Sequence, residues 1–70
     1  MVHIGQLIHQ ELLRQERTPA WLARKINCQR PNIYYIFSQP SINTELLERI
    51  SRALGVDFFM VLSECIKKEM

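Results

Sequence analysis

The sequence contains few cysteines, which could form disulfides, and few glycines and prolines, which favour sharp turns. Its 70 residues include two cysteines, two glycines and three prolines. Cys28 and Cys65 are far apart and form no CxxC pair, so neither a disulfide framework nor a zinc site is predicted; we interpret both as small buried apolar side chains. Little glycine beside 47% apolar residues argues against disorder and an all-β sandwich, and favours packed helices.

Long apolar runs are also missing. No stretch approaches the ~18 apolar residues that would span a bilayer. The opening residues 1–5 have neither a basic segment nor an apolar segment of the kind found in secretory signals. We therefore expect no membrane association and a cytoplasmic location.

Catalytic patterns are absent as well. The sequence shows no nucleophile, base and acid set, no paired carboxylates and no glycine-rich phosphate loop. His3 and His9 have no carboxylate or cysteine at ligand spacing, so we expect exposed histidines and no metal site. We expect a protein that is not an enzyme, with no cofactor and no small-molecule substrate.

The excess of positive over negative charge is small, but the charged residues are unevenly distributed along the chain. The net charge is only +2. Residues 1–40 contain five Arg and Lys against two Glu, whereas residues 41–70 contain four basic against five acidic residues. This asymmetry supports an anionic partner for the first half without proving one.

Apolar spacing and capping residues predict one all-α domain over residues 1–70, with five helices. The first covers about Ile4 to Glu16, with Ile4, Leu7, Ile8 and Leu12 on one face. Thr18 and Pro19 begin a second helix that ends near Ile26. Arg30-Pro31 opens the third, over about 30–38; Pro31 is expected to push Arg30 out of the α region and to fit the first turn itself. Asn43 and Gly55 bound the fourth, with Leu46, Leu47, Ile50 and Leu54 inside; Asp57 begins the fifth, over about 57–68.

Residues 18–38 have the pattern of a helix-turn-helix. Such a unit needs two short helices, a small residue where they cross, a tight turn and an apolar inner face. Ala23 supplies the crossing point and Asn27 the turn, because Asn tolerates a left-handed conformation. The predicted inner face consists of Leu22, Ala23, Ile26, Cys28, Ile33 and Ile36.

The whole chain resembles the lambda-repressor-like, or XRE, helix-turn-helix family. The resemblance lies in Ile4-Gly5 with Ile8, in the skeleton of Thr18, Leu22-Ala23, Ile33 and Ile36, and in Leu54-Gly55-Val56. Trp21-Leu-Ala, Arg30-x-Asn32-Ile-Tyr34-x-Ile-Phe37 and Asp57-Phe-Phe look like short stand-alone bacterial regulators of this type. Three positions depart from the family pattern: Pro19 replaces a phosphate-contacting glutamine, Asn27 replaces the turn glycine, and Leu12 with Phe37 replaces a salt bridge.

The outer face of the third helix is the predicted reading surface. Arginine can bind guanine and asparagine adenine through two hydrogen bonds, and tyrosine can contact sugars, thymine methyls or phosphates. Asn32 could instead brace the turn, and Tyr34 could lie against the fourth helix. The predicted contacts on this face are Gln29, Arg30, Asn32, Tyr34, Tyr35 and Ser38.

A second group of candidate contacts lies around the second helix, whose first N–H groups, those of Ala20 and Trp21, are expected to face a phosphate. Trp21 could equally be a core residue. The predicted contacts here are Thr18, Arg17, Trp21 and Arg24.

The fifth helix has more apolar residues than one buried stripe requires. Phe58, Val61, Leu62 and Cys65 are expected in the core. Phe59, Ile66 and Met70 are left for a homodimer interface, which would let two copies read half-sites ~34 Å apart.

The sequence thus predicts a sequence-specific regulator, a repressor, that inserts the helix at 30–38 into the major groove of double-stranded DNA. One alternative is an antitoxin-like interaction module of the same fold, whose last helix binds a partner protein. A second is a degenerate domain that no longer binds DNA.

Overall fold

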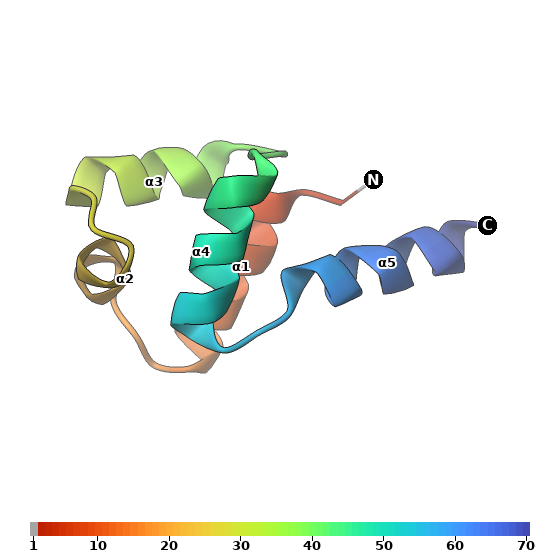
Figure 1. Cartoon of the computed structure of the whole chain (residues 1–70), viewed down its shortest axis with the longest axis horizontal. Coiled ribbons are helices and arrows are strands. Elements are labelled where there is room, and N and C mark those ends of the chain that lie inside the picture. Colours follow the sequence, from red (N-terminus) through yellow and green to blue (C-terminus); the bar gives the residue numbers. More distant parts are fainter. Residues whose placement is uncertain (1) are drawn as a thin grey trace.

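Residues 2–70, which the computed structural model describes, form five helices and contain no strand (Figure 1). The all-helical prediction is confirmed. No helix in this part of the chain is long and apolar enough to cross a membrane. The helices are α1 (Ile4–Arg14), α2 (Pro19–Lys25), α3 (Arg30–Ser38), α4 (Thr44–Leu54) and α5 (Phe58–Glu69).

Three helices begin at the capping residues predicted from sequence. Thr18 Oγ1 accepts a hydrogen bond from the Trp21 N–H at 3.1 Å, and Asn43 accepts one from Leu46 at 2.7 Å. Asp57 does the same for Met60 at 3.1 Å. Each cap satisfies one of the N–H groups that a helix start leaves unpaired, so these boundaries are fixed by residues three positions apart.

The predicted range of α3, about 30–38, is confirmed, but the expectation that Pro31 holds Arg30 outside the α region was wrong. Arg30 is the first helical residue, and the extended residue before the helix is Gln29, with φ −89° and ψ 153°. Proline disfavours a helical residue before it, but at the second position of a helix its missing N–H costs no hydrogen bond. Arg30 therefore belongs to α3, with its side chain in the first turn.

Three helices are followed within two residues by a left-handed residue: Glu16 and Asn27 at φ 58°, and Gly55 at φ 69°. The residue after each of them donates its N–H to the carbonyl five residues earlier in the chain. The N–H of Cys28, for example, donates to the carbonyl of Ala23 at 2.9 Å. This closure satisfies carbonyls at the helix end. The ends at Asn27 and Gly55 were predicted. The first helix stops at Arg14 rather than Glu16, because Glu16 itself turns left-handed.

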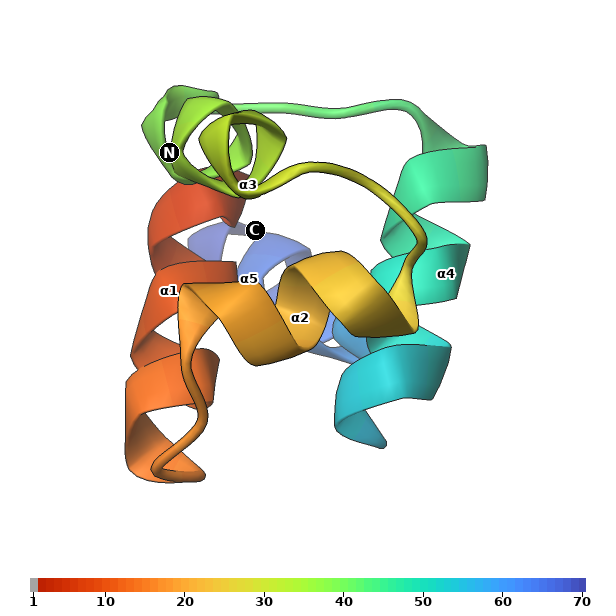
Figure 2. The same ribbon diagram turned by 90° about the vertical axis from the view of Figure 1, so that its left-hand side faces the viewer.

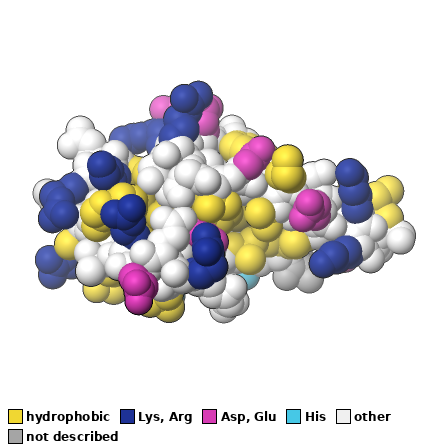
Figure 3. Space-filling view, turned by 90° about the horizontal axis from the view of Figure 1, so that it is seen from below, with side chains coloured by type: hydrophobic (Ala, Val, Ile, Leu, Met, Phe, Trp, Pro, Cys, Tyr) yellow, Lys and Arg dark blue, Asp and Glu magenta, His cyan; other side chains and the backbone are white. Residues whose placement is uncertain are grey.

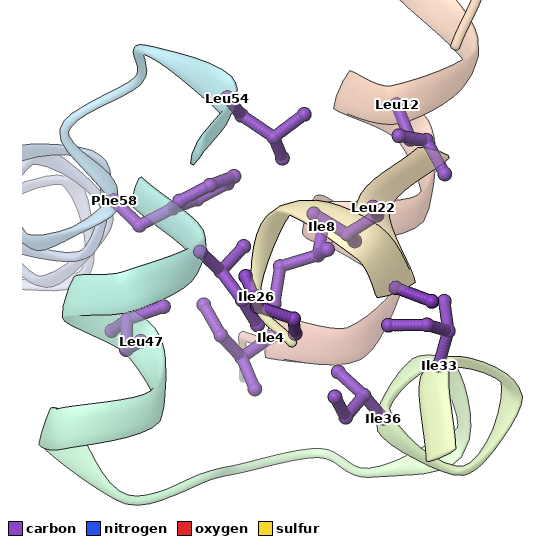
Figure 4. Packing of buried hydrophobic residues seen from close by; sticks show 12 residues of the cluster. Ile4, Ile8, Leu12, Leu22, Ile26, Ile33, Ile36, Leu47, Leu54 and Phe58 are labelled. Atoms are coloured by element: carbon purple, nitrogen blue, oxygen red, sulfur yellow. The ribbon is translucent and has the colours of Figure 1, made fainter. Parts of the chain in front are cut away.

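The core is built mainly by the first four helices (Figure 4). The predicted inner face of the α2–α3 unit, residues 18–38, is buried except for Cys28, which is half-buried. Leu7 and Leu46 are half-buried at its edge. The buried side chains are Ile4, Ile8, Leu12, Leu22, Ala23, Ile26, Ile33, Ile36, Leu47, Ile50, Leu54 and Phe58.

The α1 N-terminus is joined directly to the end of α3. The N–H groups of Ile4 and Gly5 donate to the carbonyls of Pro40 and Gln39, both at 2.9 Å. A Cβ on Gly5 would lie 2.4 Å from the carbonyl oxygens of Ile36 and Phe37, so only glycine permits this approach. In Figure 2, α3 is seen end-on above α1 and α2, and α4 lies on the opposite side of α2 from α1. The first helix thus supports the far end of α3.

The last helix extends away from this body (Figure 1), giving the molecule dimensions of 37 × 20 × 19 Å. Phe58 alone among its described residues is buried. The expectation that Val61, Leu62 and Cys65 face the core was right only in part. All three are half-buried; Leu62 packs against the core, whereas Val61 and Cys65 line hollows on the side of α5 that faces α1. The prediction of two buried cysteines was therefore wrong.

Candidate nucleic-acid interface

The α3 helix has one buried face and one exposed face. Ile33 is fully buried and Ile36 nearly so, which anchors the helix to the body. Opposite them, the fractional exposure of Tyr34 is 55% and that of Tyr35 is 65%. All six side chains predicted on the reading surface are solvent-exposed: Gln29, Arg30, Asn32, Tyr34, Tyr35 and Ser38.

Arg30 and Asn32 lie in the first turn of this helix. Arg30 is exposed and forms no ion pair with any residue between 2 and 70. Asn32 borders a hollow shared with Tyr35. A free guanidinium and a free amide two residues apart can each present paired hydrogen-bonding groups to a base edge.

The two adjacent tyrosines point toward different elements. The Tyr34 ring meets the edge of Phe37 at 6.1 Å between centroids, and Phe37 stacks on His9 of α1 at 4.2 Å. Tyr35 instead lines the hollow beside Leu46 and Arg49 of α4. It is therefore Tyr35, not Tyr34, that borders the fourth helix.

Ser38 is less available than its exposure suggests. Its hydroxyl donates to the Tyr35 carbonyl at 2.6 Å and accepts from the Gln39 side chain at 3.3 Å. The hydroxyl proton is thus engaged within the end of α3.

Trp21 lies between two cations on the outer side of α2. The Arg17 guanidinium is 4.3 Å from the ring centroid and the Lys25 ammonium is 5.7 Å away. The ring is half-buried against the core, so Trp21 is both a core-edge residue and a platform for these charges. We call Arg17, Trp21 and Lys25 the tryptophan cluster. Lys25 was not among the sequence candidates, although its spacing of four residues from Trp21 indicated this contact.

The start of α2 offers less to an anion than predicted. The Trp21 N–H, expected to be free, is bound by Thr18 Oγ1. Thr18 is therefore engaged as a cap.

Basic side chains gather where α2 and the start of α3 lie (Figure 3). Arg24 is exposed there and, like Arg30, has no ion pair within residues 2–70. The described arginines with ion pairs are Arg14, bound to Glu11, and Arg52, bound to Glu48, on other helices. Uncompensated positive charge is thus concentrated beside the exposed face of α3.

Comparison with known protein families, with curated proteins and with solved structures finds no match in any of the three. The chemistry of this face therefore carries the functional interpretation.

The residues predicted for a dimer interface lie on α5. The exposed fractions of Phe59, Ile66 and Met70 are 42%, 56% and 95%. On the side of α5 facing α1, two adjoining hollows of about 380 and 220 Å³ share Leu7 and Gln10. We call this depression the α1–α5 trough; Val61 and Cys65 line its α5 side.

Proposed function

We propose that this chain is a sequence-specific DNA-binding transcriptional regulator, a repressor acting in the cytoplasm, whose α3 enters the major groove. The observation that carries the proposal is the exposed face of α3, on which Arg30 forms no ion pair. Further positive charge, from Arg24 and the tryptophan cluster, lies beside this face. A helix of this width fits the major groove, where each base pair presents a distinct hydrogen-bonding pattern. A lambda-repressor-like arrangement is part of the proposal.

The two halves of the surface have different tasks in this proposal. Arg24 and the tryptophan cluster bind phosphates, which gives affinity in every sequence and fixes the register. Arg30, Asn32 and Tyr35 read base edges or thymine methyl groups. Arg30 is best placed for guanine because its guanidinium is free and lies in the first turn of α3.

The decisive experiment is a selection from random duplexes with the purified chain, followed by binding measurements at several salt concentrations. We expect an enriched motif and an affinity that falls as salt rises. Arg30→Ala should weaken the selected site by about 1–3 kcal/mol and relax preference at one position. Arg52→Ala is the matched control, because Arg52 is an exposed arginine on α4 already paired with Glu48. No enriched motif and no salt dependence would refute the proposal.

Trp21 gives an independent test, since it is the single tryptophan of the chain. Its fluorescence should change when DNA is added, and added salt should reverse the change. Arg17→Ala and Lys25→Ala should each lower the salt slope by about one without altering the motif. If either substitution changed the selected motif, α2 would have to contact bases and not only phosphates.

We further propose that the protein acts as a homodimer, with α5 of a second copy in the α1–α5 trough. The C-terminal half of α5 has no net charge, with Glu64 and Glu69 against Lys67 and Lys68, so two copies can pair without net repulsion. In a two-fold dimer each copy fills the other's trough, and the contact extends to the exposed Phe59, Ile66 and Met70.

Light scattering should give twice the 8.3 kDa of one chain, and Cys65→Glu should return the monomer. A monomer at micromolar concentration contradicts the dimer.

The same projecting helix favours an antitoxin-like module as the second candidate function. There, α5 would bind a different protein and DNA binding would be secondary. A stoichiometric partner released by Cys65→Glu, together with no DNA motif, would favour this function over the regulator.

A further inference from the structure

The turn between α2 and α3 is connected to α4 by one side chain. Arg49 Nη2 donates a hydrogen bond to the carbonyl of Ile26. Ile26 caps the C-terminal end of α2, and the next residue, Asn27, is left-handed. The arginine thus holds the turn at the point where the chain reverses toward α3.

Few direct contacts join α3 to α4, although both helices contribute to the same core. The α3 helix packs mainly on α1 and α2. Between the turn, α3 and α4 lies a hollow of about 230 Å³, lined by Ile26, Cys28, Asn32, Tyr35, Ile36, Leu46 and Arg49. Side chains do not fill this space, and the Arg49 hydrogen bond forms a direct polar link from α4 to the start of the turn.

The chemistry of the contact suits this role. Carbonyls in the last turn of a helix have no partner within the helix and carry partial negative charge. A guanidinium supplies a charge-assisted donor to such a carbonyl. Arg49 forms no ion pair with Glu45, one turn before it on α4, within the described residues. Its charge is therefore directed at the turn.

We propose that Arg49 is a positioning residue that fixes the turn, and through it the direction of α3, from α4. The consequence for DNA recognition rests on the proposed function; the effect on the turn does not. The chain supplies a matched control in Arg52, on the same helix but paired with Glu48 away from the turn.

The first test uses Cys28, which follows the turn directly, as a reporter in a Cys65→Ser background. We expect Arg49→Met to raise the rate of Cys28 alkylation by iodoacetamide about 5-fold, because local opening exposes the thiol. Arg49→Lys should give an intermediate rate, and Arg52→Met should leave the rate unchanged.

Electrostatics alone would act in the opposite direction. Burial raises the pKa of the Cys28 thiol, and the nearby charge of Arg49 partly offsets this effect. Removing Arg49 therefore raises that pKa further and slows alkylation in an unchanged turn. An unchanged or slower rate in Arg49→Met would overturn the proposal.

Amide exchange separates a local effect from general destabilisation. In Arg49→Met, the amides of Asn27 and Cys28 should exchange faster while those of Ile8 and Ile50 in the core remain protected. Equal acceleration at all four would mean a general loss of stability, and the proposal would fail.

The second test measures the ratio of affinities for the selected site and for random DNA. Arg49→Met should lower this ratio about 10-fold with an unchanged salt slope, and Arg49→Lys should recover part of it. A slope reduced by about one, with normal Cys28 reactivity, would make Arg49 a phosphate contact and refute positioning. If the chain binds no DNA, the proposed function fails, and the alkylation and exchange results still decide whether Arg49 holds the turn.

Discussion

The body formed by α1–α4 and the projecting α5 differ in how their apolar residues are used. Each of the first four helices places at least two side chains in a common core, whereas α5 places one, Phe58, although seven of its twelve residues are apolar. The body also joins its helices by polar contacts, from the N–H groups of α1 to the carbonyls after α3 and from Arg49 to the α2 end. An apolar side chain is therefore buried only where another part of the fold packs against it. A high apolar content in a helix does not supply that packing surface.

The largest expected loss of stability concerns Phe58, the residue at which α5 packs into the body. Phe58→Ala should destabilise the fold by about 4 kcal/mol, since a fully buried aromatic ring leaves a cavity. Phe59→Ala, the adjacent control, should cost less than about 0.5 kcal/mol in the monomer. Thermal unfolding of both variants, at a concentration where the chain is monomeric, measures the difference. Equal losses would contradict the view that Phe58 is the main anchor of α5.

The next effect tests the tight contact inside the body. Gly5→Ala should destabilise the protein by about 3 kcal/mol, because the new Cβ meets backbone oxygens that cannot move without breaking the α1–α3 hydrogen bonds. Gln6→Ala, at an exposed neighbouring position, is the control. Chemical denaturation measures both. A tolerated alanine would show that α1 and α3 can separate, and would remove the contrast with α5.

A smaller change should stabilise the body. Glu16 is left-handed without being glycine, so Glu16→Gly should raise the free energy of unfolding by about 1 kcal/mol. Asn27→Gly should gain less, because asparagine tolerates this conformation better than glutamate does. The same denaturation experiment ranks them, and a loss of stability in Glu16→Gly would mean that the carboxylate has a role beyond the turn.

The smallest effect concerns the ion pair at the end of α1. The hydrogen bond from Arg14 is the main cause that lowers the pKa of Glu11, while partial desolvation opposes it and Gln15 assists. Because the folded-state pKa lies below the unfolded one, the carboxylate stabilises the fold above the ordinary glutamate range near ~4. This contribution is lost as the pH falls through the lowered pKa.

Melting curves of wild type and Glu11→Gln between neutral and acidic pH test this assignment. They should differ by about 1–2 °C near neutrality and converge in acid. A difference that grows in acid would reverse the assigned sign. The Gln15 side chain, which also donates to the Leu54 carbonyl at 2.9 Å, should keep α1 joined to α4 in both proteins.

Helix positions and the inner face of the α2–α3 unit could be predicted from sequence because their causes are local. Thr18, Asn43 and Asp57 each bind an N–H three residues away, and Asn27 and Gly55 reverse the chain at their own positions. The exposed face of α3 follows from the same helical spacing that buries Ile33 and Ile36. Local chemistry and periodicity thus determined the five helices and the exposed face of α3.

Other features were decided only by the tertiary structure, because their partners are distant in the sequence. The need for glycine at position 5 arises from carbonyls more than thirty residues later, and Arg49 reaches back twenty-three residues to the turn. The direction of α5 has the same origin: Val61, Leu62 and Cys65 satisfy a core-facing pattern, but the fold covers them only in part, and of the three Leu62 packs against the core. Spacing shows which side of a helix is apolar; only the fold determines whether another surface meets it.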